Sequence, residues 1–205
     1  MKVLLINGSP HRDGNTNIAL NEIARQLATH GIESEIHWIG MKPVRGCIAC
    51  GKCKQNGNGR CVFDDDICNA TIEKINDADA LIVGSPVYYG TPTGPVLSLI
   101  HRCFFAGAKV EGKPAAAVAV CRRGGATAAF QTLQMPFQMM NMPLVTSQYW
   151  NIAYGREPGQ SAQDTEGMQT MRTLANNMAW MLKSINKADI TRPEKEPWQP
   201  MHFIR

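Results

Sequence analysis

The chain has 205 residues, of which 44% are hydrophobic and 19% are charged, a balance that fits one globular domain. Its 21 Lys and Arg against 17 Asp and Glu leave a formal net charge of +4. The basic side chains form no run longer than a pair such as Arg122-Arg123, so we expect no nucleic-acid partner.

Apolar stretches are short throughout the sequence. None approaches the roughly 20 residues that a membrane span needs, and the run after Lys2 is too short for the core of a signal peptide. We therefore expect a cytoplasmic protein with no membrane partner. Its seven cysteines are unusual, because disulfides are rare in a reducing compartment. Ligands, redox groups or core residues are the better interpretations.

Hydrophobic periodicity predicts strands and helices that alternate along the chain. A strand at 2–7 is followed by a helix with one apolar face from about 18 to 30. A second strand at 33–39 leads into a cysteine-rich loop at 45–68, where Asp66 is a plausible N-cap for a helix to about 77. The later elements are strands at 80–84, 115–121 and 143–147, and helices at about 93–105, 127–140 and 164–184.

This alternation implies right-handed crossovers and a parallel sheet with helices on both faces. Five strands fit the α/β flavodoxin-like doubly wound fold, with the strand order 2-1-3-4-5. We expect residues 1–187 to form the domain and residues 188–205, which contain three prolines, to form an extended C-terminal tail. Trp198 and Phe203 in that tail suggest docking on a neighbouring surface, such as another subunit.

The loop after the first strand has the composition of an anion site. It lies before a helix N-terminus, where free backbone N–H groups and the helix dipole favour negative charge. The loop matches neither the dinucleotide nor the P-loop pattern, which favours a mononucleotide. An ordinary turn capped by Asn15 or Thr16 is the alternative. The residues that suit a phosphate are Ser9, Arg12, Asn15 and Thr16, with Gly8 and Gly14 permitting close approach.

Two segments together resemble the NADPH-dependent FMN reductase family of flavodoxin-like proteins. They are Gly8-Ser9-Pro10 through Gly14-Asn15-Thr16, and Gly84-Ser85-Pro86-Val87-Tyr88-Tyr89-Gly90 after the third strand. The resemblance covers roughly residues 1–155 and implies that the first loop binds the FMN phosphate. It also implies that Pro86, Val87, Tyr88, Tyr89 and Gly90 line the isoalloxazine ring, for which tyrosine offers a flat surface. The alternative is that the tyrosines only cover the sheet edge.

Two further segments lie where this family contacts flavin or shields it. The loop after the fourth strand supplies Arg122, Gly124 and Gly125, and its arginines could meet the flavin, meet the phosphate of a pyridine nucleotide, or be solvated. Tyr149-Trp150-Asn151 follows the expected fifth strand at the same sheet end. Trp150 there either shields the flavin or packs structurally.

The most specific chemical feature is the spacing of Cys47, Cys50, Cys53 and Cys61. Three cysteines at three-residue intervals and a fourth nearby match the ligands of a [4Fe–4S] cluster, and the basic residues around them would offset its charge. The motif resembles that of the iron–sulfur flavoproteins, a branch of the same fold family. Structural zinc and metal-free thiols are the alternatives. Cys68, Cys103 and Cys121 lie outside the motif and are expected in the core.

The leading hypothesis is therefore an FMN-dependent oxidoreductase. Its flavin would take a hydride from NADH or NADPH, or electrons from a protein such as a ferredoxin, and with a cluster it would exchange one and two electrons. No catalytic acid or base is demanded. A non-enzymatic electron carrier is the alternative, although carriers of this fold are generally acidic, and a metal-binding protein without flavin is a third. The family resemblance, the methionine-rich last helix and the aromatic tail imply a homodimer or homotetramer.

Overall fold

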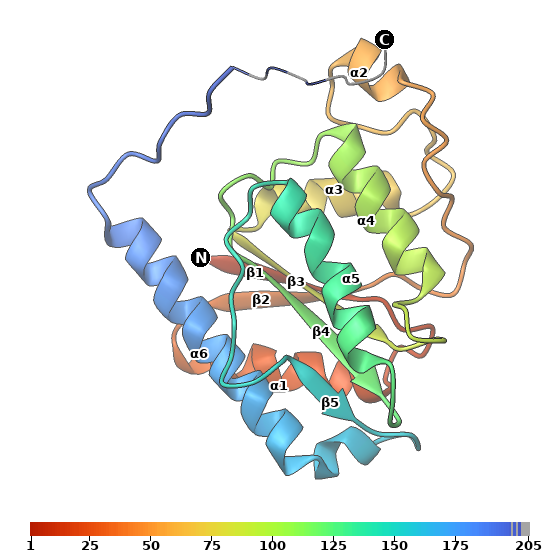
Figure 1. The fold of residues 1–205 in the computed structure, drawn as a ribbon, viewed down its shortest axis with the longest axis vertical. Coiled ribbons are helices and arrows are strands. Elements are labelled where there is room, and N and C mark those ends of the chain that lie inside the picture. Colours follow the sequence, from red (N-terminus) through yellow and green to blue (C-terminus); the bar gives the residue numbers. More distant parts are fainter. Residues whose placement is uncertain (198, 200, 202–205) are drawn as a thin grey trace.

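A computed structural model of the protein describes residues 1–197, 199 and 201. Its strands form one parallel sheet in the order β2-β1-β3-β4-β5, which confirms the predicted flavodoxin-like fold (Figure 1). The strands are β1 (Lys2–Asn7), β2 (Glu33–Trp38), β3 (Ala80–Pro86), β4 (Ala115–Cys121) and β5 (Ile152–Tyr154). The helices are α1 (Asn15–Thr29), α2 (Lys52–Asn56), α3 (Cys68–Asp77), α4 (Gly94–Ala106), α5 (Ala126–Met139), η1 (Gln160–Gln163) and α6 (Thr165–Lys187).

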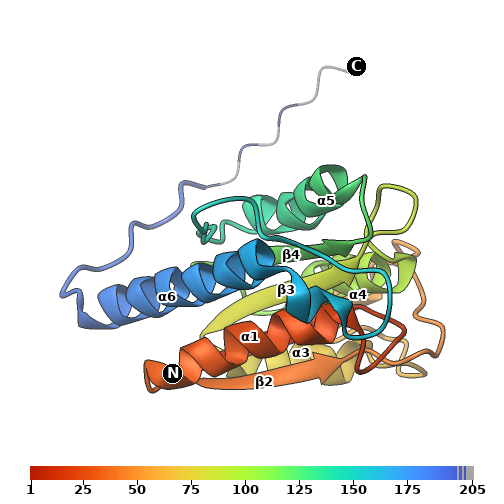
Figure 2. The ribbon, with the colours of Figure 1, turned by 90° about the horizontal axis from the view of Figure 1, so that it is seen from below.

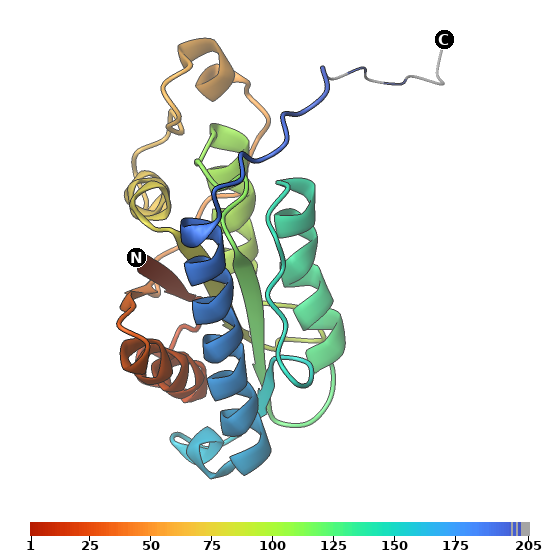
Figure 3. The same ribbon diagram turned by 90° about the vertical axis from the view of Figure 1, so that its left-hand side faces the viewer.

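The sheet is the middle of three layers. Successive side chains of a strand point to opposite faces, so Val3 and Leu5 of β1 pack under α1 and α6, while Leu4 and Ile6 pack under α3, α4 and α5. Figures 2 and 3 show α1 and α6 together on one side of the sheet. Since both faces are covered, the inner strands are mostly apolar, and β4 is buried at every position.

The fifth strand corrects the sequence expectation. The segment 143–147 begins to pair beside β4, because Val145 donates its N–H to the Ala115 carbonyl at 2.8 Å and Leu144 forms an isolated bridge there. The chain then leaves the sheet and returns only at Ile152–Tyr154, where it pairs with the last three residues of β4. Tyr149, Trp150 and Asn151 therefore precede β5 instead of following it.

One additional helix and one different helix cap distinguish the structure from the prediction. The cysteine-rich segment is not loop throughout, because it contains the five-residue helix α2 between Gly51 and Gly57, both in the left-handed region. Asp66 is not the N-cap of α3; Ile67 holds that position, although Asp66 still accepts a hydrogen bond from the Cys68 N–H at 3.0 Å. The α6 start is as expected, since Asp164 accepts from the Gly167 N–H at 2.9 Å.

Beyond α6, residues 188–197 form neither helix nor strand and are exposed. The Arg192 and Lys195 side chains form ion pairs with Glu111 at 3.5 and 2.5 Å. The expectation for Trp198 and Phe203 lies outside the described residues, and the division into a domain and a tail stays a prediction. Among the helices described, none is both long and apolar enough to span a membrane.

Candidate functional site

A cleft of about 760 Å³ opens where the parallel strands end. Ligands of open α/β sheets bind at this edge, because the loops from neighbouring strands diverge there. The loops after β1, β3 and β4 line the cleft together with residues beyond β2 and β5. Of the predicted cofactor residues, those that line it are Ser9, Arg12, Gly14, Asn15, Thr16, Pro86, Val87, Tyr88 and Arg122.

The loop after β1 is held by its own polar groups. Buried Asn7 accepts a hydrogen bond from the Ser9 N–H at 3.0 Å and donates one to the Arg12 carbonyl at 3.1 Å. The Ser9 hydroxyl accepts from the His11 N–H at 3.1 Å. Gly8 is required here, because a Cβ would lie 2.8 Å from the Val96 side chain. The loop is therefore a preformed turn at the base of the cleft.

The same loop delivers the N-terminus of α1 to the cleft. Gly14 is the N-cap residue, no side chain caps the helix in the described structure, and its first turn holds no acidic residue. The first N–H groups of the helix thus supply positive partial charge at this point. The Arg12 guanidinium, 5.9 Å from the centre of the Trp38 ring, adds a full charge. This end of the cleft favours an anion.

Asn15 differs from the other predicted phosphate residues because both polar atoms of its side chain are already hydrogen-bonded. Its amide nitrogen donates to the Glu157 carbonyl at 2.9 Å, and its amide oxygen accepts from the Ser161 N–H at 3.0 Å. The residue lines the cleft, but its side chain holds the segment that follows β5 against the first loop.

The loop after β3 presents two tyrosines differently. Tyr88 lines the cleft and forms paired backbone hydrogen bonds with Thr91 at 2.8 and 3.0 Å. Tyr89 has a left-handed backbone (φ 52°) and a fully exposed side chain, and it does not line the cleft. Gly90 and Gly125 also lie outside the lining; a Cβ on Gly125 would lie 2.9 Å from the Gly90 Cα. These glycines let the two loops touch. Gly124 is not in the lining either.

Several lining residues were not expected from the sequence. Trp38 ends β2 and donates from its indole Nε1 to the Ser9 carbonyl at 2.8 Å. The sequence signal that could have placed Trp38 in the cleft was its position at the end of a predicted strand. Trp150, proposed as a shield, does not line the cleft; its ring packs on Tyr149 with centroids 5.2 Å apart. The other unexpected lining residues include Met41, Val120, Cys121, Gly155 and Arg156.

Cys47, Cys50, Cys53 and Cys61 line a second, much smaller cavity of about 20 Å³. Cys47 and Cys50 are exposed, Cys61 is half-buried and Cys53 is buried. The wrap depends on left-handed residues on both sides of α2, among them Ala49 (φ 53°) and Gly59 (φ 68°). Among the described residues, no three His, Cys, Asp or Glu side chains converge on a point for a single metal ion. The four thiols of the sequence motif instead line the walls of the small cavity.

The remaining cysteines are buried, as expected. The Sγ atoms of Cys68 and Cys103 lie 3.9 Å apart between α3 and α4. The hydrogen bond to Cys68 and burial raise the pKa of Cys103, and burial raises the pKa of Cys121. The raised pKa values of Cys103 and Cys121 favour the neutral thiol, which suits core residues better than metal ligands, while the hydrogen bond with Cys103 lowers the pKa of Cys68.

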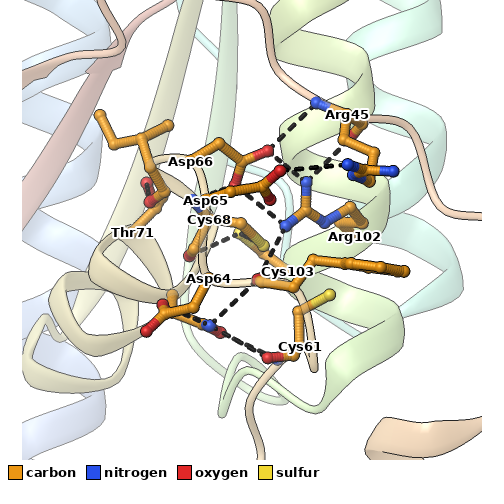
Figure 4. Close-up of polar contacts among 12 residues, drawn as sticks. Arg45, Cys61, Asp64, Asp65, Asp66, Cys68, Thr71, Arg102 and Cys103 are labelled. Carbon is orange, nitrogen blue, oxygen red and sulfur yellow. Dashed lines mark hydrogen bonds and ion pairs between the residues drawn. The ribbon is translucent and has the colours of Figure 1, made fainter.

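Two buried side chains fix the ends of the cysteine segment. Asn69 is 2% exposed; it accepts from the Cys61 N–H at 2.8 Å and donates to the Cys61 carbonyl at 3.0 Å. Arg102 of α4 forms a bidentate pair with Asp66 at 2.5 and 2.9 Å (Figure 4). Burial alone would raise the pKa of Asp66, but hydrogen bonds from Arg102 and two backbone N–H groups hold it below its usual value.

The strand order and the cleft at the strand ends define a flavodoxin-like α/β protein. Solved structures agree on the fold: RosB with bound 8-demethyl-8-formylriboflavin-5'-phosphate superposes with a TM-score of 0.67 at 15% identity, covering 100% of this chain and 95% of that one. A flavodoxin from the domain Archaea gives a TM-score of 0.61 at 15% identity, covering 89% of this chain and 99% of that one.

The sequence defines the family. The family model of the NADPH-dependent FMN reductases matches residues 1–157, and the chain belongs to this family of oxidoreductases. An iron-sulfur flavoprotein of Methanocaldococcus jannaschii is 33% identical over 196 residues, covering 91% of this chain and 100% of the relative. An iron-sulfur flavoprotein of Methanosarcina thermophila is 29% identical over 194 residues, covering 91% and 98%.

Proposed function

We propose that the protein is an FMN-dependent oxidoreductase that also carries a [4Fe–4S] cluster and passes electrons between the two. The observation that carries the proposal is the presence, in one chain, of an anion-favouring cleft at the strand ends and a separate cavity lined by four cysteines. Family membership and the names of the relatives support both cofactors.

The cleft suits FMN in size and in polarity. Its volume lies within the range of roughly 300–1,000 Å³ that is typical of small-molecule sites. The phosphate would lie at the N-terminus of α1, near the Ser9 hydroxyl and Arg12, where the helix favours negative charge. The isoalloxazine ring would lie against Val87 and Tyr88, which line the cleft together with Trp38. Tyr89 and the glycines of the two loops would shape the backbone without touching the ring.

The cysteine cavity suits a four-iron cluster in its donor set. Such a cluster is held by four thiolates at different irons, so its ligands surround a volume instead of meeting at one point. The cavity is small as it stands, but Cys47 and Cys50 belong to an exposed segment, so it can widen without disturbing the core. The cluster's negative charge would be offset by Lys52 and Lys54, whereas Arg45, Arg60 and Arg102 are each paired with a carboxylate.

When bound, FMN supplies the hydride and electron chemistry, and the cluster supplies one-electron transfer. The protein's own residues bind and orient these groups, and no side chain needs to act as an acid or base. The donor in this proposal is NADH, NADPH or a protein such as a ferredoxin. Steady-state oxidation of NADH or NADPH with a quinone separates the enzyme from a non-enzymatic carrier.

Cofactor content of anaerobically purified protein tests the proposal. We expect one FMN and about four iron and four sulfide atoms per chain. Cys50→Ala should remove the iron and its absorbance but retain FMN, because the two sites are separate. The control is Cys121→Ala, which removes a thiol outside the cysteine cavity and should keep the iron. Flavin without iron or sulfide in the wild type would contradict the cluster proposal, and loss of both cofactors in Cys50→Ala would contradict the separation.

A further inference from the structure

Arg102 is an unusual residue for its position. It lies on α4, a helix that otherwise buries apolar side chains, and its own side chain is only 2% exposed. A buried guanidinium is costly to the fold unless its charge and its N–H groups are satisfied. Its surroundings should therefore account for all of its donors.

The two terminal nitrogens of Arg102 are well satisfied. Besides the bidentate pair with Asp66, Nη1 donates to the Arg45 carbonyl at 2.9 Å and Nη2 to the Phe63 carbonyl at 3.4 Å. Arg45 lies two residues before Cys47, and Phe63 lies two residues after Cys61. One side chain thus ties both ends of the cysteine segment to α4 (Figure 4).

The Nε–H of Arg102 is different. It is buried and has no hydrogen-bond partner among the described residues. An unsatisfied buried donor destabilises the fold, so such groups are rare without a role. Arg102 also lines the cavity formed by the four cysteines. The residue that carries the unpaired donor therefore also lines the cavity of the four thiols, and its guanidinium lies near the sulfurs of Cys61 and Cys68.

We propose that Arg102 is a positioning residue for the group held by the four cysteines, with its Nε–H donating a hydrogen bond to a thiolate or sulfide sulfur. This inference rests on the proposed function. The charge of Arg102 is already balanced by Asp66, so the effect comes from the hydrogen bond. A hydrogen bond to a cluster sulfur favours the more negative, reduced form of the cluster, and such bonds help to set its potential. Arg102 therefore raises the reduction potential of the cluster.

The test compares two charge-conserving variants. Arg102→Lys keeps the positive charge beside Asp66 but removes Nε, and Arg60→Lys makes the same change at an exposed arginine next to Cys61. We expect the midpoint potential of the cluster, followed by EPR, to fall in Arg102→Lys by about 59 mV, the equivalent of a tenfold change in a one-electron equilibrium. Arg60→Lys should match the wild type, and FMN content should stay constant in both. An unchanged potential in Arg102→Lys would overturn the role of Arg102.

A second measurement does not depend on a folded variant. Wild-type protein labelled with 15N-arginine should show a nitrogen coupling to the reduced cluster in pulsed EPR. A cluster without that coupling overturns the inference but leaves the proposed function intact. A wild type without iron overturns the proposed function and this role with it, so the two failures are distinguishable.

Discussion

The cleft and the cysteine segment are built in different ways. The cleft takes its shape from loops that leave a buried parallel sheet, so its position follows from the strand order. The cysteine segment lies away from the sheet, beyond the ends of α3 and α4 (Figures 1 and 3), and its only helix has five residues. It is held by buried polar side chains, above all Arg102 and Asn69.

This difference indicates which substitutions should disturb each site. A change in a cleft loop leaves the sheet beneath it intact, whereas a change in a polar anchor releases the segment that carries the thiols. The predictions below test that contrast, and they run from the largest expected effect to the smallest.

Breaking the ion pair between Asp66 and Arg102, which anchors the cysteine segment, should lower the free energy of unfolding strongly. Asp66→Asn removes the charge that compensates buried Arg102, and breaking such a pair typically costs about 3–5 kcal/mol. Asp65→Asn is the matched control, because Asp65 is 62% exposed and its pair with Arg45 lies at the surface. Urea unfolding should show the large loss only for Asp66→Asn, with iron lost more readily than FMN. Equal losses of unfolding free energy in the two variants would contradict the role of Asp66 as the anchor.

The same pair predicts a pH dependence. The pKa of Asp66 is lowered in the folded protein, so its charge stabilises the fold above the unfolded pKa of about 3.9, and that stabilisation is lost as the pH falls through the folded value. The difference in unfolding free energy between wild type and Asp66→Asn should be constant from about pH 7 to 5 and should narrow below about pH 4. A difference that widens in acid would contradict the assignment.

Substitution of Trp38, which lines the cleft, should have a smaller effect that is confined to FMN binding. Trp38→Phe keeps a ring but removes the hydrogen bond to the Ser9 carbonyl, a change worth about 0.5–1.5 kcal/mol. FMN affinity, measured by quenching of flavin fluorescence, should fall roughly two- to tenfold, while iron content is unchanged. Trp180→Phe, on the exposed side of α6, is the control and should leave the affinity as in the wild type. Loss of iron in Trp38→Phe would show that the two sites are not independent.

Much of the fold was predictable because its signals are local. The apolar runs of β1, β3 and β4 and the amphipathic helices follow from periodicity. The fifth strand was wrong because Ile152–Tyr154 is too short to show a period, whereas the apolar run around Val145 pairs only briefly with the start of β4. The helix α2 was missed because its five residues lie between glycines.

In the candidate sites, too, a residue could be predicted where its signal is local in the sequence. Ser9, Pro86 and Tyr88 could be placed in a cleft because the carboxyl ends of parallel strands meet at one edge. The roles of Arg102 and Asn69 could not, because burial of a polar side chain depends on a partner that sequence spacing does not reveal. Asp66 illustrates this: its local pattern indicated an N-cap, and its main partner is an arginine 36 positions away.

The side-chain amide of Asn15 has a consequence for how the protein is made. Its two partners, Glu157 and Ser161, lie 142 and 146 positions further along the chain. Chains are synthesised from the N-terminus, so the first loop is made well before the segment after β5 that the Asn15 side chain holds. A ribosome-bound chain that ends after β4 would therefore lack a closed site. We therefore expect a ligand to be retained only after the segment that contains Ser161 has been synthesised.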